Sequence, residues 1–128
     1  MEATHNITGE KGVLQNFRRL STPLPVNGLE KNSPALYATG IGYLPIVFRD
    51  GEVILAECLY SSDVAQTIIS PTAITQQYKD VFVGWNLFAN VREETGYLQL
   101  MNKDGINHPT LDMFCESNLW YHYLPTNI

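Results

Sequence analysis

The chain of 128 residues has little charge and little cysteine. Only 16% of its residues are charged, eight of them Lys or Arg, and the formal net charge is −5. No basic surface of the kind that neutralises phosphates is evident, so we expect no nucleic-acid partner. The two cysteines, Cys58 and Cys115, belong to no CxxC or Cys/His array, which argues against a zinc site and a disulfide framework. Free, buried thiols are the simpler interpretation.

The sequence also lacks a charged-then-apolar leader and any apolar run near the roughly 20 residues that span a bilayer. We therefore expect no membrane partner and an intracellular, cytoplasmic setting. His5, His108 and His122 show no metal-ligand spacing, and no serine lies in a Gly-x-Ser-x-Gly elbow, so no metal, cofactor or serine nucleophile is predicted. Asn6-Ile7-Thr8 fits the glycosylation sequon, which we interpret as chance because no secretion signal accompanies it.

What is present is a long series of β-prone segments separated by turn signals. With 45% hydrophobic residues the chain can bury one core, which favours a single domain over residues 1–128, ordered over 36–128 and irregular over 12–35. Asp50-Gly51 and Asp104-Gly105 predict hairpin turns, and this explains the two aspartates better than a carboxylate pair does. Strands are predicted at Leu36 to Phe48, Val53 to Tyr60, Val81 to Phe88, Gly96 to Met101, Leu111 to Cys115 and Leu119 to Leu124.

Helical signals are few. Ser70-Pro71 places a capping hydroxyl before a proline at the first helical position, which predicts a helix from Pro71 to Lys79. Gly12 to Leu20 has the spacing of one helical turn. Together the elements predict an all-β fold, a small and mostly antiparallel barrel with one short α-helix.

Three blocks, in this order, resemble the protease region of copia-type retrotransposon polyproteins. The first is Ala3-Thr4-His5-Asn6-Ile7-Thr8-Gly9, the second is Tyr37 to Gly42 with the strand end Glu57-Cys58-Leu59-Tyr60, and the third is Ile68-Ile69-Ser70-Pro71. The C-terminal third, from Gly96 to Tyr121, is similar to the stretch that follows in such polyproteins. The resemblance implies a retropepsin-like barrel, closed or partly closed.

The resemblance also implies where catalysis would lie. In this family an Asp-Ser-Gly or Asp-Thr-Gly triplet directly precedes an Ala-Ser or Ala-Thr pair, here Ala3 and Thr4, so the aspartate would stand before Met1. No aspartate of the 128 residues begins such a triplet, and Glu2 is a poor substitute because it stands where glycine is expected. The dyad of a retropepsin needs one aspartate from each subunit of a homodimer. As written, the chain is predicted to have no catalytic residue.

Four residues are candidates for a peptide groove or its covering flap by the same resemblance: Gly40, Gly42, Ile68 and Ile69. Gly40 and Gly42 have an equally good alternative, a bulge or tight bend in a strand. A base-stacking platform could include Trp85, Trp120, Tyr121 and Tyr123, but core or rim positions on strands explain these aromatic residues as well.

Three functions follow as hypotheses. The first is a retrotransposon-derived domain that no longer cleaves peptides and persists as a remnant or as a protein- or peptide-binding module. The second is an aspartic endopeptidase that processes its own polyprotein as a homodimer, with the aspartate upstream of Met1. The third is an effector-like interaction domain unrelated to proteolysis. The partners to expect are accordingly a second copy of the chain or a protein or peptide ligand.

Overall fold

Two open β-sheets make up most of the described chain. The structure, a computed structural model, describes residues 5–26, 36–116 and 119–121. Each sheet has four strands, and one short α-helix lies between them in the sequence. The prediction of a mostly β fold with one short helix is confirmed. No closed barrel is found among the described strands, because each sheet ends in strands that are bonded on one side only.

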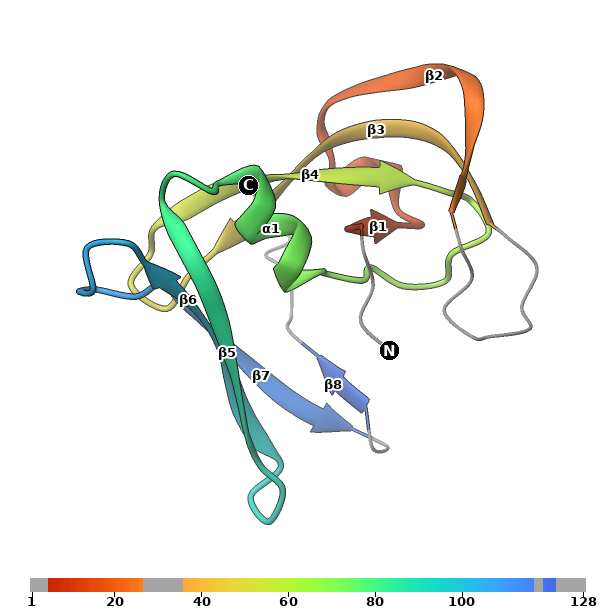
Figure 1. Cartoon of the computed structure of the whole chain (residues 1–128). Helices are drawn as coiled ribbons and strands as arrows, with labels where there is room; N and C mark the ends of the chain where they lie inside the picture. Colours follow the sequence, from red (N-terminus) through yellow and green to blue (C-terminus); the bar gives the residue numbers. More distant parts are fainter. Residues whose placement is uncertain (1–4, 27–35, 117–118, 122–128) are drawn as a thin grey trace. The chain divides into compact units, whose positions relative to one another are not determined.

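The first sheet has the order β1-β4-β3-β2 (Figure 1). Its strands are β1 (Ile7–Thr8), β2 (Gln15–Val26), β3 (Leu36–Val47) and β4 (Val53–Tyr60). The two-residue β1 runs parallel to the end of β4, and β2 runs antiparallel to β3. Gly51, with φ of +89°, closes the turn between β3 and β4, so the Asp-Gly hairpin is confirmed.

The N-terminal third differs from the prediction. The expected helical turn over Gly12 to Leu20 is only a 3-10 helix, η1 (Lys11–Val13), and β2 begins two residues later. Pairing with β3 outweighs the weak local helical spacing. The stretch predicted to be irregular is strand as far as Val26, despite Pro23 and Pro25. An edge strand tolerates proline, and two register shifts in β2 absorb the irregularity.

The helix α1 (Pro71–Gln77) begins where Ser70-Pro71 predicts it. The Ser70 hydroxyl accepts a hydrogen bond from the backbone N–H of Ala73 at 3.1 Å, the geometry of an N-cap. The helix has seven residues, too few to be stable in isolation, and Ile74 is its one buried residue. Packing of Ile74 and the N-cap therefore stabilise it.

The second sheet is an antiparallel meander in the order β5-β6-β7-β8 (Figure 1). Its strands are β5 (Phe82–Asn90), β6 (Thr95–Asn102), β7 (Thr110–Glu116) and β8 (Leu119–Tyr121). The β6–β7 hairpin confirms the second predicted hairpin. The β5–β6 hairpin was not predicted, and its turn places Glu94 at φ of +57°.

The described chain divides into two compact units, each with its own buried side chains. The first consists of residues 1–45 and 55–77, the second of residues 46–54 and 78–128. Ile7, Ala38, Leu59 and Val64 form the core cluster of the first unit. Buried side chains of the second unit include Phe82, Leu98, Leu100 and Leu111. The single domain over residues 1–128 that the sequence predicts stays a prediction.

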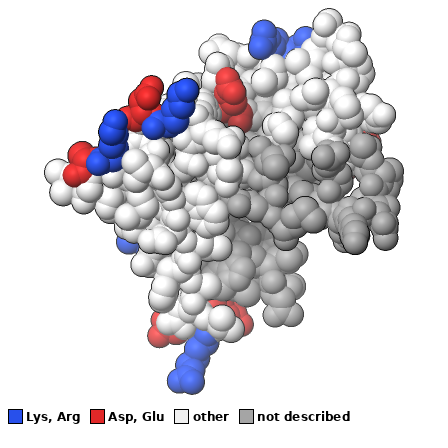
Figure 2. Space-filling view, in the orientation of Figure 1, with Lys and Arg blue, Asp and Glu red and all other residues white. Residues whose placement is uncertain are grey.

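The described surface carries few charges. Figure 2 shows basic and acidic side chains that are scattered and mixed on the face it presents. In the second unit, Arg49 donates two hydrogen bonds to the carboxylate of Asp112, and its guanidinium lies 5.9 Å from the centre of the Tyr97 ring. Among the described residues, no helix has the length and apolar character to cross a bilayer.

Candidate functional site

The three family-like blocks meet in the first unit, around Ile7. The N–H of Ile7 donates to the carbonyl oxygen of Ile68 at 3.0 Å, and the N–H of Ile68 returns a bond to Ile7 at 2.8 Å. On the other side, Ile7 and Thr8 pair in parallel with Leu59 and Tyr60 of β4. The segment after Thr4 is thus clamped between the strand end of the second block and the start of the third.

Asn6 binds the second and third blocks with its side chain. Its Nδ2 donates to the carbonyl oxygen of Glu57 at 2.9 Å, and its Oδ1 accepts from the N–H of Ser70 at 2.6 Å. The residue is 2% exposed. The Asn6 amide holds the segments of Glu57 and Ser70 in place, because breaking either hydrogen bond would leave a buried polar atom unsatisfied, which is costly. The sequon asparagine therefore has a structural role.

Thr8 and Gly9 fasten the other end of this short strand. The hydroxyls of Thr8 and Thr67 lie 2.7 Å apart, and Thr8 is fully buried. A Cβ on Gly9 would lie 1.7 Å from the carbonyl oxygen of Val64. No side chain fits at that distance, so the close approach of two backbone segments requires glycine here.

The open edge of β4 beside this clamp is covered by a second side-chain amide. Oε1 of Gln77 accepts from the N–H of Glu57 at 2.8 Å, and its Nε2 donates to the carbonyl oxygen of Leu55 at 3.0 Å. The amide thus makes the two bonds that a neighbouring strand would make. It fixes the end of α1 against the sheet.

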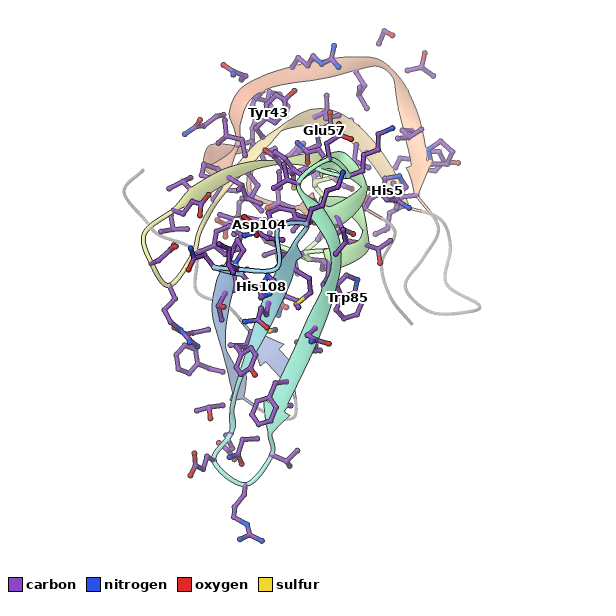
Figure 3. All side chains as sticks on the ribbon, turned by 60° about the vertical axis from the view of Figure 1, so that its left-hand side comes forward. His5, Tyr43, Glu57, Trp85, Asp104 and His108 are labelled. Atoms are coloured by element: carbon purple, nitrogen blue, oxygen red, sulfur yellow. The ribbon has the colours of Figure 1, made fainter. Side chains whose placement is uncertain are left out.

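A small hollow of about 100 Å³ opens beside these two amides. Its walls are His5, Asn6, Ile41, Glu57, Cys58, Leu59, Ala73 and Gln77. Binding sites for whole small molecules are typically about 300–1,000 Å³, so this hollow suits one side chain of a larger ligand. Its lining combines apolar groups with an exposed imidazole and an exposed carboxylate, those of His5 and Glu57 (Figure 3).

Cys58 supplies no nucleophile to this hollow. Burial raises the pKa of the Cys58 thiol to about 12. Since the thiolate is the reactive form, a thiol that is neutral at physiological pH is inert. Cys58 is free and buried, as the sequence predicts, whereas the side chain of Cys115 lies outside the described residues.

The two glycines proposed for a flap are buried in β3 and closely covered. A Cβ on Gly40 would lie 2.3 Å from the ring of Phe17, and one on Gly42 would lie 3.0 Å from both Leu14 and Gln15. Gly40 pairs with Arg19, next to a register shift in β2. The glycines therefore give β2 and Leu14, the residue before it, room to lie close against β3.

The remaining candidates are placed as follows. Ile68 forms the bridge to Ile7 and packs on the core cluster, and Ile69 is half-buried beside it in sequence. Ala3 and Thr4, which follow the expected catalytic position, lie outside the described residues. The structure thus brings Ile68 to the first block, while Gly40 and Gly42 are closely covered by Leu14 and by residues of β2.

Asp50, Asp104 and His108, which the sequence singled out, make hydrogen bonds within turns and loops. Asp50 and Asp104 each accept a hydrogen bond from the N–H two residues ahead, at 2.9 and 3.0 Å. This confirms their assignment to turns. Nδ1 of His108 accepts from the N–H of Asn102 at 2.9 Å and braces the same loop, where Figure 3 labels both Asp104 and His108. Among the described residues, no group of three or more metal-binding side chains gathers.

No protein-family model, no curated protein and no solved structure matched the chain when it was compared with each. The site therefore rests on its own geometry. Asn6 and Gln77 hold the clamp together, a role that the sequence did not predict for either residue. Nothing local in the sequence marks them, because their partners lie 64, 51, 20 and 22 residues away.

Proposed function

We propose that the chain is a retropepsin-like module of a copia-type retrotransposon polyprotein, and that its first unit binds an extended peptide. The observation that supports this is the convergence of the three family-like blocks on Ile7. These blocks are up to 64 residues apart, yet Asn6 joins Glu57 to Ser70 through one side chain. Three blocks that matched the family's sequence by chance would not be expected to contact one another in the fold.

The retropepsin-like interpretation of the fold belongs to this proposal. Its argument is the local clamp and not a closed barrel, since both described sheets are open. The hollow between His5, Glu57 and Ala73 is the part of the first unit that a peptide side chain fits. A backbone beside it would meet the β4 edge that the Gln77 amide now covers.

Cleavage is a separate matter from binding. An aspartic protease uses two carboxylates that share a proton, one as base toward water and one as acid toward the scissile carbonyl. No aspartate in these 128 residues begins an Asp-Ser/Thr-Gly triplet. With the residues given, the proposed module binds peptide and does not cleave it.

A second candidate function is the aspartic endopeptidase itself, acting as a homodimer once a triplet precedes Ala3. The arrangement of His5 to Thr8 favours it. Bonds on both sides of Ile7 and through the Asn6 amide give the incoming chain a fixed direction. A catalytic loop needs such anchoring, because small misplacements of a reacting group cost large factors in rate.

One substitution tests both statements. Met1-Glu2 is replaced by Asp-Ser-Gly, and the purified protein is assayed for cleavage of a peptide library at acidic pH. The matched control carries Asn-Ser-Gly, which keeps the shape and removes the carboxylate. We expect cleavage by the first variant only. A folded Asp-Ser-Gly variant that binds no peptide and cleaves none contradicts the proposal and leaves the effector-like interaction domain as the better hypothesis.

A further inference from the structure

The edge of β4 that faces β1 changes its hydrogen-bond partner along its length. At the end of β4 the partner is a backbone, since the N–H of Leu59 donates to the carbonyl oxygen of Asn6 at 2.9 Å in the parallel pairing with β1. One step earlier along β4 the partner is a side chain, because Nδ2 of Asn6 donates to the carbonyl oxygen of Glu57. The backbone ladder stops there, and side-chain amides continue it.

Gln77 fills the next two positions of this ladder. In a parallel pair, one residue of the neighbouring strand donates to the carbonyl oxygen before its partner and accepts from the N–H after it. The Gln77 amide does the same around Ala56, because its Nε2 donates to Leu55 at 3.0 Å and its Oε1 accepts from Glu57 at 2.8 Å. A side chain of α1 thus stands in for one residue of an added strand that runs in the direction of β1.

The Gln77 amide can be displaced from this edge. Both of its hydrogen bonds are exposed to solvent, whereas the bond from Ser70 to Asn6 is buried. An exposed neutral hydrogen bond adds little net stability, because water replaces either partner when the bond breaks. A strand that makes the same two bonds therefore displaces Gln77 at little cost.

The hollow beside the two amides adjoins the same edge. Glu57 and Gln77 belong to its walls, together with apolar groups of Ile41 and Leu59. Because Gln77 is one of these walls, its displacement opens the hollow toward β4. Peptides that add a strand to a sheet gain affinity from backbone bonds and specificity from side chains that enter such hollows. One extended ligand can therefore use the edge and the hollow together.

Charge selects the class of side chain that enters. Figure 3 labels His5 and Glu57, the two exposed titratable residues of the walls. The carboxylate of Glu57 forms no ion pair with another described residue, and the chain has a net charge of −5. Lysine and arginine carry a cation at the end of an apolar stem. Such a side chain complements walls that combine apolar groups with a carboxylate.

We propose that the first unit binds a basic peptide by strand addition. An extended segment pairs with β4 from Leu55 to Glu57 in the direction of β1 and displaces the Gln77 amide. A lysine or arginine of the segment then enters the hollow and lies beside the Glu57 carboxylate. This inference rests on the proposed function, since it names the class of peptide and the way in which the same unit binds it. Gln77 is accordingly a built-in competitor of the ligand.

The first experiment tests the charge preference by fluorescence anisotropy with the full chain. The probe is a short, end-capped peptide of alternating threonine and valine with one central lysine, and its partner has glutamate in place of the lysine. We expect the lysine peptide to bind at least about tenfold more tightly at low salt. Glu57→Gln is expected to remove most of this preference. Equal affinity for the two peptides overturns the proposal.

The second experiment tests the competition. Gln77→Ala removes the amide that occupies the edge, so the lysine peptide is expected to bind about three- to tenfold more tightly. Gln77→Met, which keeps the length of the side chain without its two bonds, is expected to do the same if alanine weakens α1. Gln76→Ala is the matched control, because Gln76 is exposed on the same helix. Binding that both Gln77 variants leave unchanged or weaken shows that the amide does not compete.

Amide hydrogen exchange locates the peptide independently. Saturating lysine peptide is expected to slow exchange of the Glu57 N–H at least about tenfold, because a strand covers a bond that is now exposed. The N–H of Ile68, which donates to Ile7, is the internal control and is expected to keep its rate. Peptide binding without protection of Glu57 refutes strand addition alone. If no variant binds any peptide, the proposed function fails and this inference fails with it.

Discussion

The side-chain oxygen of Asn6 accepts a hydrogen bond from the backbone N–H of Ser70, 64 residues away, at 2.6 Å. The same amide donates to Glu57 on β4. One side chain thus ties the N-terminal segment to a sheet and to the start of α1. Few other side chains could replace Asn6, because the position requires a donor and an acceptor on one short side chain.

Asn6→Ala tests that role. The substitution removes the hydrogen bonds that Asn6, 2% exposed, makes with the N–H of Ser70 and the carbonyl oxygen of Glu57, so we expect the free energy of unfolding to fall by about 1–3 kcal/mol. Urea unfolding measures it. Gln76→Ala, on the exposed side of α1, serves as control and is expected to change stability by less than about 0.5 kcal/mol. Similar losses in both variants would refute the assignment.

Gly9→Ala is expected to be more damaging than its size suggests. The added Cβ would lie 1.7 Å from the carbonyl oxygen of Val64, and backbone must move to admit it. We expect a loss of about 1–3 kcal/mol or failure to fold. Gly12→Ala is the matched control, because a Cβ there meets nothing within 4 Å. If thermal unfolding finds the two variants equally stable, the close approach at Gly9 is wrong.

Stability above neutral pH should depend on Cys58. Burial raises the pKa of its thiol from an ordinary value of 9.0 to about 12. The folded state therefore holds the proton more tightly than the unfolded state. The resulting stabilisation is complete below about pH 9 and is lost as the pH rises toward 12, by at most about 1.4 kcal/mol per pH unit.

The measurement compares urea unfolding of the unaltered chain and of Cys58→Ala between pH 8 and the alkaline limit of solubility. Tyrosine and lysine titrate in the same range, so the difference between the two proteins carries the information. We expect the unaltered chain to lose stability more steeply than the variant. Parallel curves would contradict a buried neutral thiol.

The two Asp-Gly turns should respond alike to substitution. Gly51 and Gly105 have φ of +89° and +80°, which an L side chain adopts at a cost. Alanine at either position is expected to cost about 1 kcal/mol in unfolding free energy. Asparagine, which tolerates this region better, is expected to restore part of the loss. If the alanine variants are as stable as the unaltered chain, the turns do not require a positive φ at these positions, and the prediction is wrong.

The sequence predicts best the elements that have turn or helix-capping residues at their ends. β4 runs from Val53 to Tyr60 as expected, because Asp50-Gly51 starts it and a serine pair ends it. α1 begins at Pro71 for the same reason. The β5–β6 hairpin escaped prediction because the turn between Asn90 and Thr95 contains no glycine or proline. Glu94 adopts the left-handed backbone conformation there, a conformation in which glycine is more common.

The candidate site was less accessible to prediction than the fold. Ile68 was a groove candidate through its block and does pair with Ile7, whereas Gly40 and Gly42, candidates for a flap or for a bend in a strand, are covered by Phe17 and Leu14. Local patterns show where a strand needs glycine but not which distant side chain fills the space. The same holds for the Gln77 amide, which completes the edge of β4 from 20 residues away.

The tip of the β3–β4 hairpin has a consequence for how the chain can be divided. Residues 46–54 belong to the second unit, although the strands that carry them begin and end in the first. Arg49 donates its N–H to Thr110, and its side chain holds Asp112. A cut after Gln77 would place this hairpin tip on one fragment and Thr110 and Asp112, which it contacts, on the other. Because each unit is built from two separate stretches of the chain, we expect neither to fold on its own from a fragment cut after Gln77.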